Sequence, residues 1–403
     1  MTLKSGLLAY LKRFNYFIRK RFCQHGCIPE GQHGGRGNPR FAIMSSMTNL
    51  DPPRPTLEDV AKLAGVSLGS ASRALSVPDQ VKPKTLAQVK RAVEQLGYVS
   101  NGAARALASK RTRTIGAIYP TMYNPAFVES LHTLQQTLWA MNYQVVLAIH
   151  EYIPEREYDV VRAVVERGVD GVVLVGTAHE DRVFDLMRQR RIPLVLTWQR
   201  DEPRYGECIG FDNWRATYDM TKEVLARGHE RIAIVCGSME HNQRALQRVA
   251  GTADAMKEVR LELSKDLIFE EPFSIQGGRD AIRRIAALDE RPTALICHTD
   301  LQAIGAIHEC GILGIRVPED MSITGMDDIE LAELTHPPLT TIRVPTKEIG
   351  VLAARRIVEL AEKRTGMEPL SVECTIVIRE SLGEAPADAK SATPIKKPRR
   401  KTG

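Results

Sequence analysis

The sequence lacks the long apolar segments that membrane proteins and exported proteins carry. No apolar run approaches the roughly 20 residues that a membrane-spanning helix needs. No apolar core followed by a small-residue cleavage site marks a signal peptide. Seven cysteines are present without a regular framework, which is typical of free thiols in a reducing compartment. We therefore expect a cytoplasmic protein with no membrane partner.

The motifs of nucleotide-dependent catalysis and of metal binding are missing as well. No P-loop and no GxGxxG follows a predicted strand, and HExxH does not occur. Cys23 and Cys27 lie near His25 and His33, but their spacing matches no standard zinc site. We expect no metal, no cofactor and no enzymatic activity.

The strongest local pattern begins at Thr56 and has the form of a helix-turn-helix. Thr56 opens a capping-box-like start, after which apolar residues recur at helical spacing. Gly65 can take the positive φ of a turn, and Ser67 is a suitable N-cap for a second helix over residues 68–75. A third helix fits residues 85–96. This pattern places side chains in the DNA major groove, although it also occurs as a plain packing unit.

Basic residues gather near this pattern. The net charge of +6 is modest, but Lys and Arg crowd the first part of the chain and return in a run near its end. Such runs are commonly solvated, yet beside a helix-turn-helix they favour a polyanion as the partner.

A short alanine-rich helix is predicted within residues 97–114. A helix of this length is marginal in water, so we expect it to fold when bound. Leu107 is its one large apolar residue. Two such helices side by side could insert Leu107 as a wedge into the DNA minor groove. The alternative is that Leu107 docks on its own domain.

From Ile115 onward, short apolar runs alternate with amphipathic helical segments. The runs are IGAIYP, VVLAI, GVVLVG, PLVLTW, IAIVCG, TALICHT and MSITGM. This alternation predicts parallel sheets with helices on both faces, and the length suits two α/β lobes. Asp212 falls near the point where the chain is predicted to pass from the first lobe to the second. Residues 337–342 are predicted to carry the chain back, so that a helix over 348–363 packs on the first lobe. A cleft between two lobes suits the binding of a small ligand.

Together these segments resemble the lactose-repressor (LacI) family of bacterial transcription regulators, over roughly Pro55 to Arg379. The motifs that carry the resemblance are TLEDVAKLAGVSLGSASRAL, QLGY, NGAARALASKRTRTIGAIYP, NPAF, GFDN, LARGHERIAIVCG, HTDLQAIGA, GIRVPEDMSITGMDD and PPLTTIRVP. The resemblance implies a small all-α helix-turn-helix head plus an α/β two-lobed, periplasmic-binding-protein-like core with parallel sheets. It also implies a homodimer that reads a double-stranded operator DNA and responds to a small-molecule effector.

The resemblance assigns DNA-binding roles in the head and in the linker helix to Ser67, Leu68, Gly69, Ser70, Ser72, Arg73, Asn101, Ala104, Arg105 and Leu107. Arg73 can bind guanine O6 and N7 together. Leu68 and Gly69 cannot make the hydrogen bonds that many family members make there, so thymine-methyl contact or DNA shape is expected to carry more of the specificity. Lys82 stands where the family usually has a capping serine, which leaves the start of the third helix less defined.

For the effector cleft, the resemblance indicates Ala126, Phe127, Trp198, Arg248 and Asp300. Arg248 matches an arginine that commonly clamps a ligand carboxylate or hydroxyl groups, and Arg244 and Gln247 are close enough in the sequence to compete for that role. Asp300 can accept hydrogen bonds from sugar hydroxyls or cap the following helix. Phe127 and Trp198 can instead be ordinary core residues. GFDN resembles gluconate-repressor-like members, so the expected effector is a sugar or a sugar acid such as gluconate.

Five segments follow from these patterns. They are a basic, disordered extension over 1–54 with an alternative start at Met44 or Met47, the helix-turn-helix domain over 55–99, a hinge over 100–113, an effector-binding and dimerisation core over 114–382, and a basic disordered tail over 383–403. The expected function is an effector-controlled, nucleoid-associated transcription regulator, most simply a repressor. The alternative is a sugar-binding protein of the same bilobal fold without a DNA role. No leucine heptads follow the core, so we expect a dimer.

Overall fold

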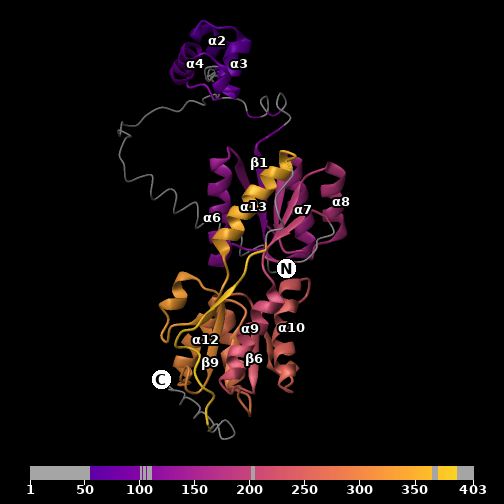
Figure 1. The fold of residues 1–403 in the computed structure, drawn as a ribbon, viewed down its shortest axis with the longest axis vertical. Coiled ribbons are helices and arrows are strands. Elements are labelled where there is room, and N and C mark those ends of the chain that lie inside the picture. The colour runs from indigo at the N-terminus through magenta and orange to yellow at the C-terminus, as the bar shows by residue number, and fades with distance from the viewer. Residues whose placement is uncertain are drawn as a thin grey trace, which may run out of the picture.

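A small helical head precedes two α/β lobes that follow one another along the long axis of the molecule (Figure 1). The computed structural model describes residues 55–99, 102, 106, 111–200, 205–364 and 371–387. None of the helices within these ranges is long and apolar enough to cross a membrane. The fold class expected from the sequence is confirmed.

The described head consists of α2 (Leu57–Ala64), α3 (Leu68–Ser76), the 3₁₀ turn η1 (Pro78–Gln80) and α4 (Pro83–Leu96). The expected capping box at Thr56 is present, and Gly65 ends α2 with a φ of 66°. Ser67 begins α3 by accepting the N–H of Ser70. The third helix starts earlier than the predicted residue 85, because Pro83 brings a helical φ to its first turn.

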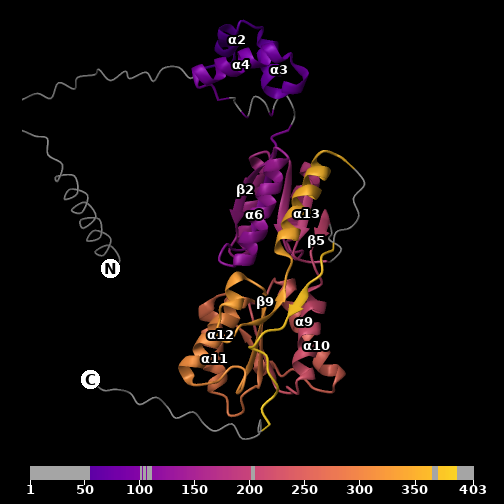
Figure 2. The same ribbon diagram turned by 60° about the vertical axis from the view of Figure 1, so that its left-hand side comes forward.

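The first lobe is a parallel sheet covered by helices on both faces, with the strand order β2-β1-β3-β4-β5. Its strands are β1 (Thr114–Tyr119), β2 (Gln144–Ile149), β3 (Gly171–Val175), β4 (Leu194–Thr197) and β5 (Glu207–Ile209). The helices α6 (Pro125–Ala140) and α13 (Thr346–Ala361) pack together on one face (Figure 2). The helices α7 (Pro154–Glu166) and α8 (Asp181–Arg190) cover the other face. The predicted return of the chain to the first lobe is confirmed by α13.

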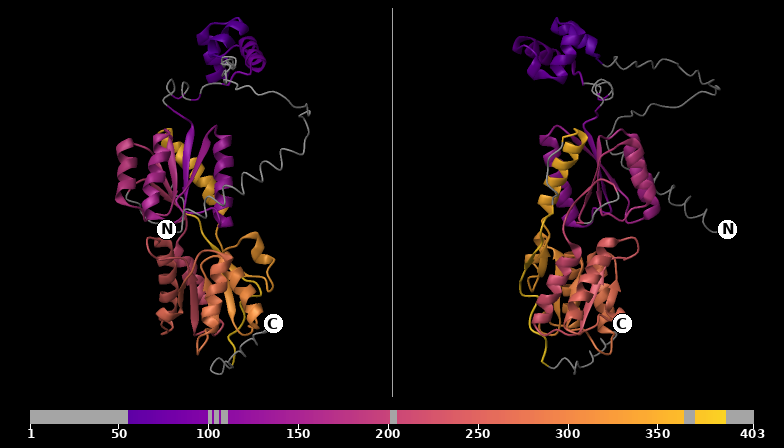
Figure 3. Two further views of the ribbon diagram at one scale, coloured as in Figure 1. Left: turned by 180° about the vertical axis from the view of Figure 1, so that it is seen from behind. Right: turned by 45° about the vertical axis from the view of Figure 1, so that its right-hand side comes forward.

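The second lobe has the strand order β11-β10-β9-β8-β6-β7, in which β11 runs antiparallel to β10. Its strands are β6 (Ile232–Cys236), β7 (Ile268–Glu270), β8 (Ala294–Cys297), β9 (Ser322–Asp327), β10 (Thr340–Arg343) and β11 (Thr375–Val377). The helices α9 (Asn213–Ala226) and α10 (Gln243–Glu258) form one pair, and α11 (Ile275–Ala286) and α12 (Asp300–Leu313) form the other (Figure 3). Each pair packs on the sheet through apolar side chains.

The described chain crosses between the two lobes three times. These crossings form the interlobe hinge, which is separate from the predicted hinge over residues 100–113. The first follows β5, near the predicted change of lobe at Asp212; the second joins β10 to α13, and the third leads into β11. A parallel bridge joins Gly210 of the first crossing to Ser371 of the third, and Val372 N donates to Gly210 O at 2.9 Å. These hydrogen bonds keep two of the three segments side by side.

Hydrogen bonds hold the chain to the core on both sides of the predicted boundaries at residues 114 and 382. The carboxylate of Asp170 accepts the N–H of Thr112 at 2.9 Å. At the other end Gly383 N donates to Ser322 Oγ at 3.0 Å. Residues 1–54 and 388–403, predicted to be disordered, lie outside the described residues.

Candidate functional site

The predicted DNA-contacting side chains of the head lie on the outer face of α3 and at its start. Residues Ser67, Leu68, Gly69, Ser72 and Arg73 are exposed and Ser70 is half-buried. Ala71 and Ala74 turn inward, and Leu68 leaves 48% of its surface exposed. An exposed face of this kind, opposite a buried alanine stripe, is what a major-groove helix requires.

Arg73 and Gly69 shape the centre of this face. Nε of Arg73 donates to Gly69 O at 3.2 Å, and no described residue engages the two Nη atoms. A methyl group at Gly69 would meet no atom of the head within 4 Å. Packing within the head therefore does not require glycine there, and the bare backbone leaves room for a base or a phosphate. The head also carries six basic against four acidic residues over 55–99.

The predicted hinge residues Asn101, Ala104, Arg105 and Leu107 lie outside the described residues. Their contacts with DNA stay predictions.

A cleft between the lobes has a wide outer part and a narrow inner part. The outer part has a volume of about 780 Å³ and the inner part about 20 Å³. Tyr152 from the first lobe and Phe273 and Asn242 from the second lobe line both parts. The rings of Tyr152 and Phe273 are 5.8 Å apart between their centroids, so this pair separates the two parts.

The structure brings Phe127, Trp198, Arg244 and Arg248 together at the inner part. The rings of Phe127 and Trp198 meet edge to face at 4.6 Å. The indole Nε1 of Trp198 is buried and has no hydrogen-bond partner among the described residues. A buried N–H without a partner is costly, so this atom favours a ligand that offers an acceptor.

Arg248 reaches the inner cavity from α10 and is held there by neutral groups. Its Nε donates to Asn213 Oδ1 at 2.8 Å and its Nη1 donates to His298 O at 2.9 Å. Burial lowers the pKa of Arg248 to about 10, which leaves the side chain cationic at neutral pH. Asn213 Nδ2 also donates to Trp198 O at 2.9 Å, so the positions of Arg248 and Trp198 are linked.

Arg244 lies one turn earlier on α10 and extends across to the first lobe. A Cβ at Gly176, just after β3, would clash with Arg244 Nη1. Burial raises the pKa of Tyr152, and the neighbouring charge of Arg244 opposes this rise. Within the described part of the chain, neither Arg244 nor Arg248 forms an ion pair with a carboxylate.

Asp300 and Ala126 do not line either part of the cleft. The carboxylate of Asp300 is fully buried and accepts from Thr341 Oγ1 at 2.5 Å and from a backbone N–H at 2.8 Å. Both of its oxygens accept hydrogen bonds from the protein, and the binding of sugar hydroxyls by Asp300 stays a prediction. Asp300 is not the helix cap, because Thr299 caps α12. Ala126 is 2% exposed and is a core residue.

The carboxyl group at the inner cavity belongs to Asp327, which the sequence reasoning missed. Asp327 ends β9, and its Oδ2 accepts from Asn124 Nδ2 of the first lobe at 3.1 Å. Burial and the neighbouring Asp300 raise the pKa of Asp327 to about 8 against the opposing effect of Arg248, so it is protonated at neutral pH. The sequence signal for Asp327 is the pair of aspartates that ends the strand-like segment MSITGMDD. In α/β proteins, ligands bind at the carboxyl ends of parallel strands.

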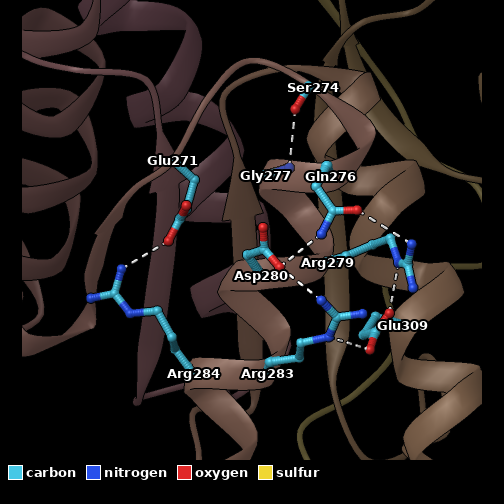
Figure 4. Close-up of polar contacts among 9 residues, drawn as sticks. All are labelled: Glu271, Ser274, Gln276, Gly277, Arg279, Asp280, Arg283, Arg284 and Glu309. Atoms are coloured by element: carbon cyan, nitrogen blue, oxygen red, sulfur yellow. Dashed lines mark hydrogen bonds and ion pairs between the residues drawn. The ribbon is translucent and has the colours of Figure 1, made fainter. Parts of the chain in front are cut away.

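The loop that carries Phe273 is anchored at both ends. Ser274 Oγ accepts from Gly277 N at 3.1 Å to cap α11, and Glu271 pairs with Arg284 at 2.9 Å. A network between α11 and α12 continues this anchor through Arg279, Arg283 and Glu309 (Figure 4). These contacts tie the loop at the second-lobe wall of the cleft to α11 and α12.

Comparison with known proteins gives matches over both parts of the chain. Residues 56–101 match the family "Bacterial regulatory proteins, lacI family", and residues 221–382 match "Periplasmic binding protein-like domain". The HTH-type transcriptional repressor PurR of Aliivibrio salmonicida (strain LFI1238) is 31% identical over 330 residues, which are 81% of this chain and 98% of PurR. The HTH-type transcriptional regulator GntR of Escherichia coli (strain K12) is 30% identical over 304 residues, which are 75% of this chain and 91% of GntR.

A solved structure with the same architecture is the transcriptional regulator CelR-cellobiose complex. It is 28% identical, with a TM-score of 0.60 over 81% of this chain and 100% of that chain. The match of the head argues against the alternative of a sugar-binding protein without a DNA role. The curated relatives named here are transcription regulators and not enzymes. The chain belongs to the lacI family of bacterial regulatory proteins, and it is a DNA-binding transcription regulator whose two-lobed core binds a small effector.

Proposed function

We propose that this regulator is a repressor whose effector is a sugar acid, such as gluconate, with its carboxylate directed toward Arg244 and Arg248. The observation that carries the proposal is the convergence of these two guanidinium groups on one small cavity, without a carboxylate ion pair from the described residues. Buried cations without a counter-charge are costly, which favours an anionic ligand. Protonated Asp327 leaves this positive charge uncancelled at neutral pH.

The other groups at the inner cavity fit a hydroxylated ligand. Asn124, Asn242 and Thr299 offer polar side chains, and Phe127 and Trp198 offer apolar faces. A volume of about 20 Å³ has room for about one water molecule. Binding therefore requires the lobes to move about the interlobe hinge. This motion is the step through which the ligand acts.

The DNA-binding side of the proposal joins the head to the dimer. Arg73 reads base edges from the exposed face of α3, with the serines of that face near the phosphates, and paired hinge helices place Leu107 in the minor groove. In a homodimer, a change in the angle between the lobes changes the spacing of the two heads and so the affinity for the operator. The protein then acts in the bacterial cytoplasm, on the nucleoid.

Fluorescence anisotropy on a fragment of the gene's own promoter tests the proposal. We expect the logarithm of the affinity to fall steeply with the logarithm of the salt concentration. We also expect gluconate to change operator affinity by about fivefold or more. Glucose, which lacks the carboxylate, is the matched control. Equal responses to gluconate and glucose would contradict a sugar acid, and a flat salt dependence would contradict the DNA-binding mode.

A further inference from the structure

Charges are separated along the cleft. The lining of the outer part contains no Lys or Arg, and its charged members besides histidines are Glu151, Glu157, Glu180 and Glu240. The inner part is lined by two arginines and by Asp327. A ligand lying along the cleft therefore meets cationic groups at its inner end and neutral or acidic groups at its outer end, where a second anionic group is disfavoured.

Glu157 and His179 form a self-contained pair in the outer wall. His179 Nδ1 lies 2.9 Å from Glu157 Oε1, and His179 Nε2 lies 2.9 Å from Gly176 O. Both ring nitrogens of His179 therefore have a polar partner inside the protein. Burial raises the pKa of Glu157, but the hydrogen bond from His179 and its charge outweigh it, so the pKa is lowered.

His150 is the unsatisfied group beside this pair. It is 7% exposed, and both of its ring nitrogens are buried without a hydrogen-bond partner in the described structure. Its Nε2 lies 3.6 Å from Glu157 Oε1. Burial lowers the pKa of His150, which leaves a neutral ring with one N–H donor and one acceptor nitrogen. A donor and an acceptor on one side chain that lines a cavity match the hydroxyl groups of a sugar.

We propose that the outer part of the cleft is a second subsite for an uncharged sugar ring, so that the effector is a sugar acid that carries a further sugar unit. The orientation of this ligand depends on the proposed function above. The outer volume of about 780 Å³ lies within the range of roughly 300–1,000 Å³ typical of small-molecule sites. Ser238, Asn242 and Ser274 line it from the second lobe, while His150 lines it from the first. The outer ring therefore contacts both lobes.

Calorimetric titration of the full chain with three related probes tests this subsite. The probes are D-gluconate, cellobionate (gluconate with a glucosyl group on O4) and cellobiose. We expect cellobionate to bind about tenfold more tightly than gluconate. In a His150→Phe variant, cellobionate should lose most of this advantage, while the affinity for gluconate stays unchanged and so reports an intact inner site. His308→Phe is the matched control, because His308 is exposed and lines neither part of the cleft.

The three probes separate the failure of this subsite from the failure of the proposed function. If gluconate binds but cellobionate binds no more tightly, or if its advantage survives in His150→Phe, the outer subsite is overturned and the sugar-acid proposal stands. If neither acid binds, while cellobiose binds to the wild type and not to His150→Phe, the sugar-acid proposal fails and the outer subsite stands. If none of the three binds, both are overturned.

Discussion

Replacement of Asp327 by asparagine should make the stability of the protein less dependent on pH near neutrality. The pKa of Asp327 is about 8 in the folded protein, against an ordinary value of 3.8. Between these two values the folded protein holds a proton that the unfolded chain has released. Rising pH therefore lowers the free energy of unfolding, by about 1.4 kcal/mol for each pH unit. Asparagine does not titrate, so the variant lacks this loss.

The window from pH 6.5 to 7.5 isolates the effect, because burial raises the pKa of the neighbouring Asp300 only to about 6. Over this window the wild type should lose about 1.4 kcal/mol more than Asp327→Asn, which is tenfold in the unfolding equilibrium. Asp327 is 5% exposed, so solvent screening is small. For a core of this size the difference corresponds to roughly 3–6 °C in the melting temperature.

Thermal melts of both proteins at the two pH values provide the measurement. Asp266→Asn is the control, since Asp266 is exposed on the second lobe. Its pH dependence should match that of the wild type. If the wild type and Asp327→Asn lose the same stability over this window, Asp327 is ionised in the folded protein. The positive charge assigned to the inner cavity would then be largely cancelled.

Four further predictions follow from the site and the head. Gluconate should bind more weakly as the pH rises through 8, because ionised Asp327 repels its carboxylate; calorimetry at pH 7 and 9 checks this, and Asp327→Asn should remove the change. Arg73→Ala should lower operator affinity by about 1–3 kcal/mol and relax preference at one base pair, measured with single-base operator variants. Ser67→Ala removes the cap of α3 and should cost about 1 kcal/mol of head stability, measured by circular dichroism. Leu107→Ala should weaken operator binding and leave nonspecific binding largely intact; equal losses on both DNAs would contradict the wedge.

The ends of the head helices were predictable because their determinants are local. The capping box at Thr56, the left-handed Gly65 and the cap at Ser67 each involve residues within a few positions of one another. The parallel strands were predictable as well, because burial on both faces gives continuous apolar runs. The start of α4 is also marked locally, because Pro83 suits a first helical turn, two residues before the predicted start at residue 85.

The cleft was only partly predictable, because its geometry depends on distant partners. The family motifs point to Arg248 and Trp198, which line the inner part of the cleft, and to Asp300, whereas the aspartate that lines it is Asp327. Both aspartates stand at the carboxyl ends of strands, and what distinguishes them is that Thr341, 41 positions away, engages the carboxylate of Asp300. The contact between His179 and Glu157 likewise joins positions 22 residues apart, and no pattern in the sequence couples these two positions.

The position of α13 has a consequence for synthesis of the protein. Ile349, Ala353 and Ile357 are buried against the first lobe, yet they are translated only after most of the second lobe. Until they emerge from the ribosome, the face of the first-lobe sheet beside α6 stays open, while the head is already complete. Such an intermediate exposes apolar surface and is prone to aggregation. A product truncated before residue 346 would keep the DNA-reading head and lose the core that controls it, so premature termination would release a DNA-binding fragment that no effector regulates.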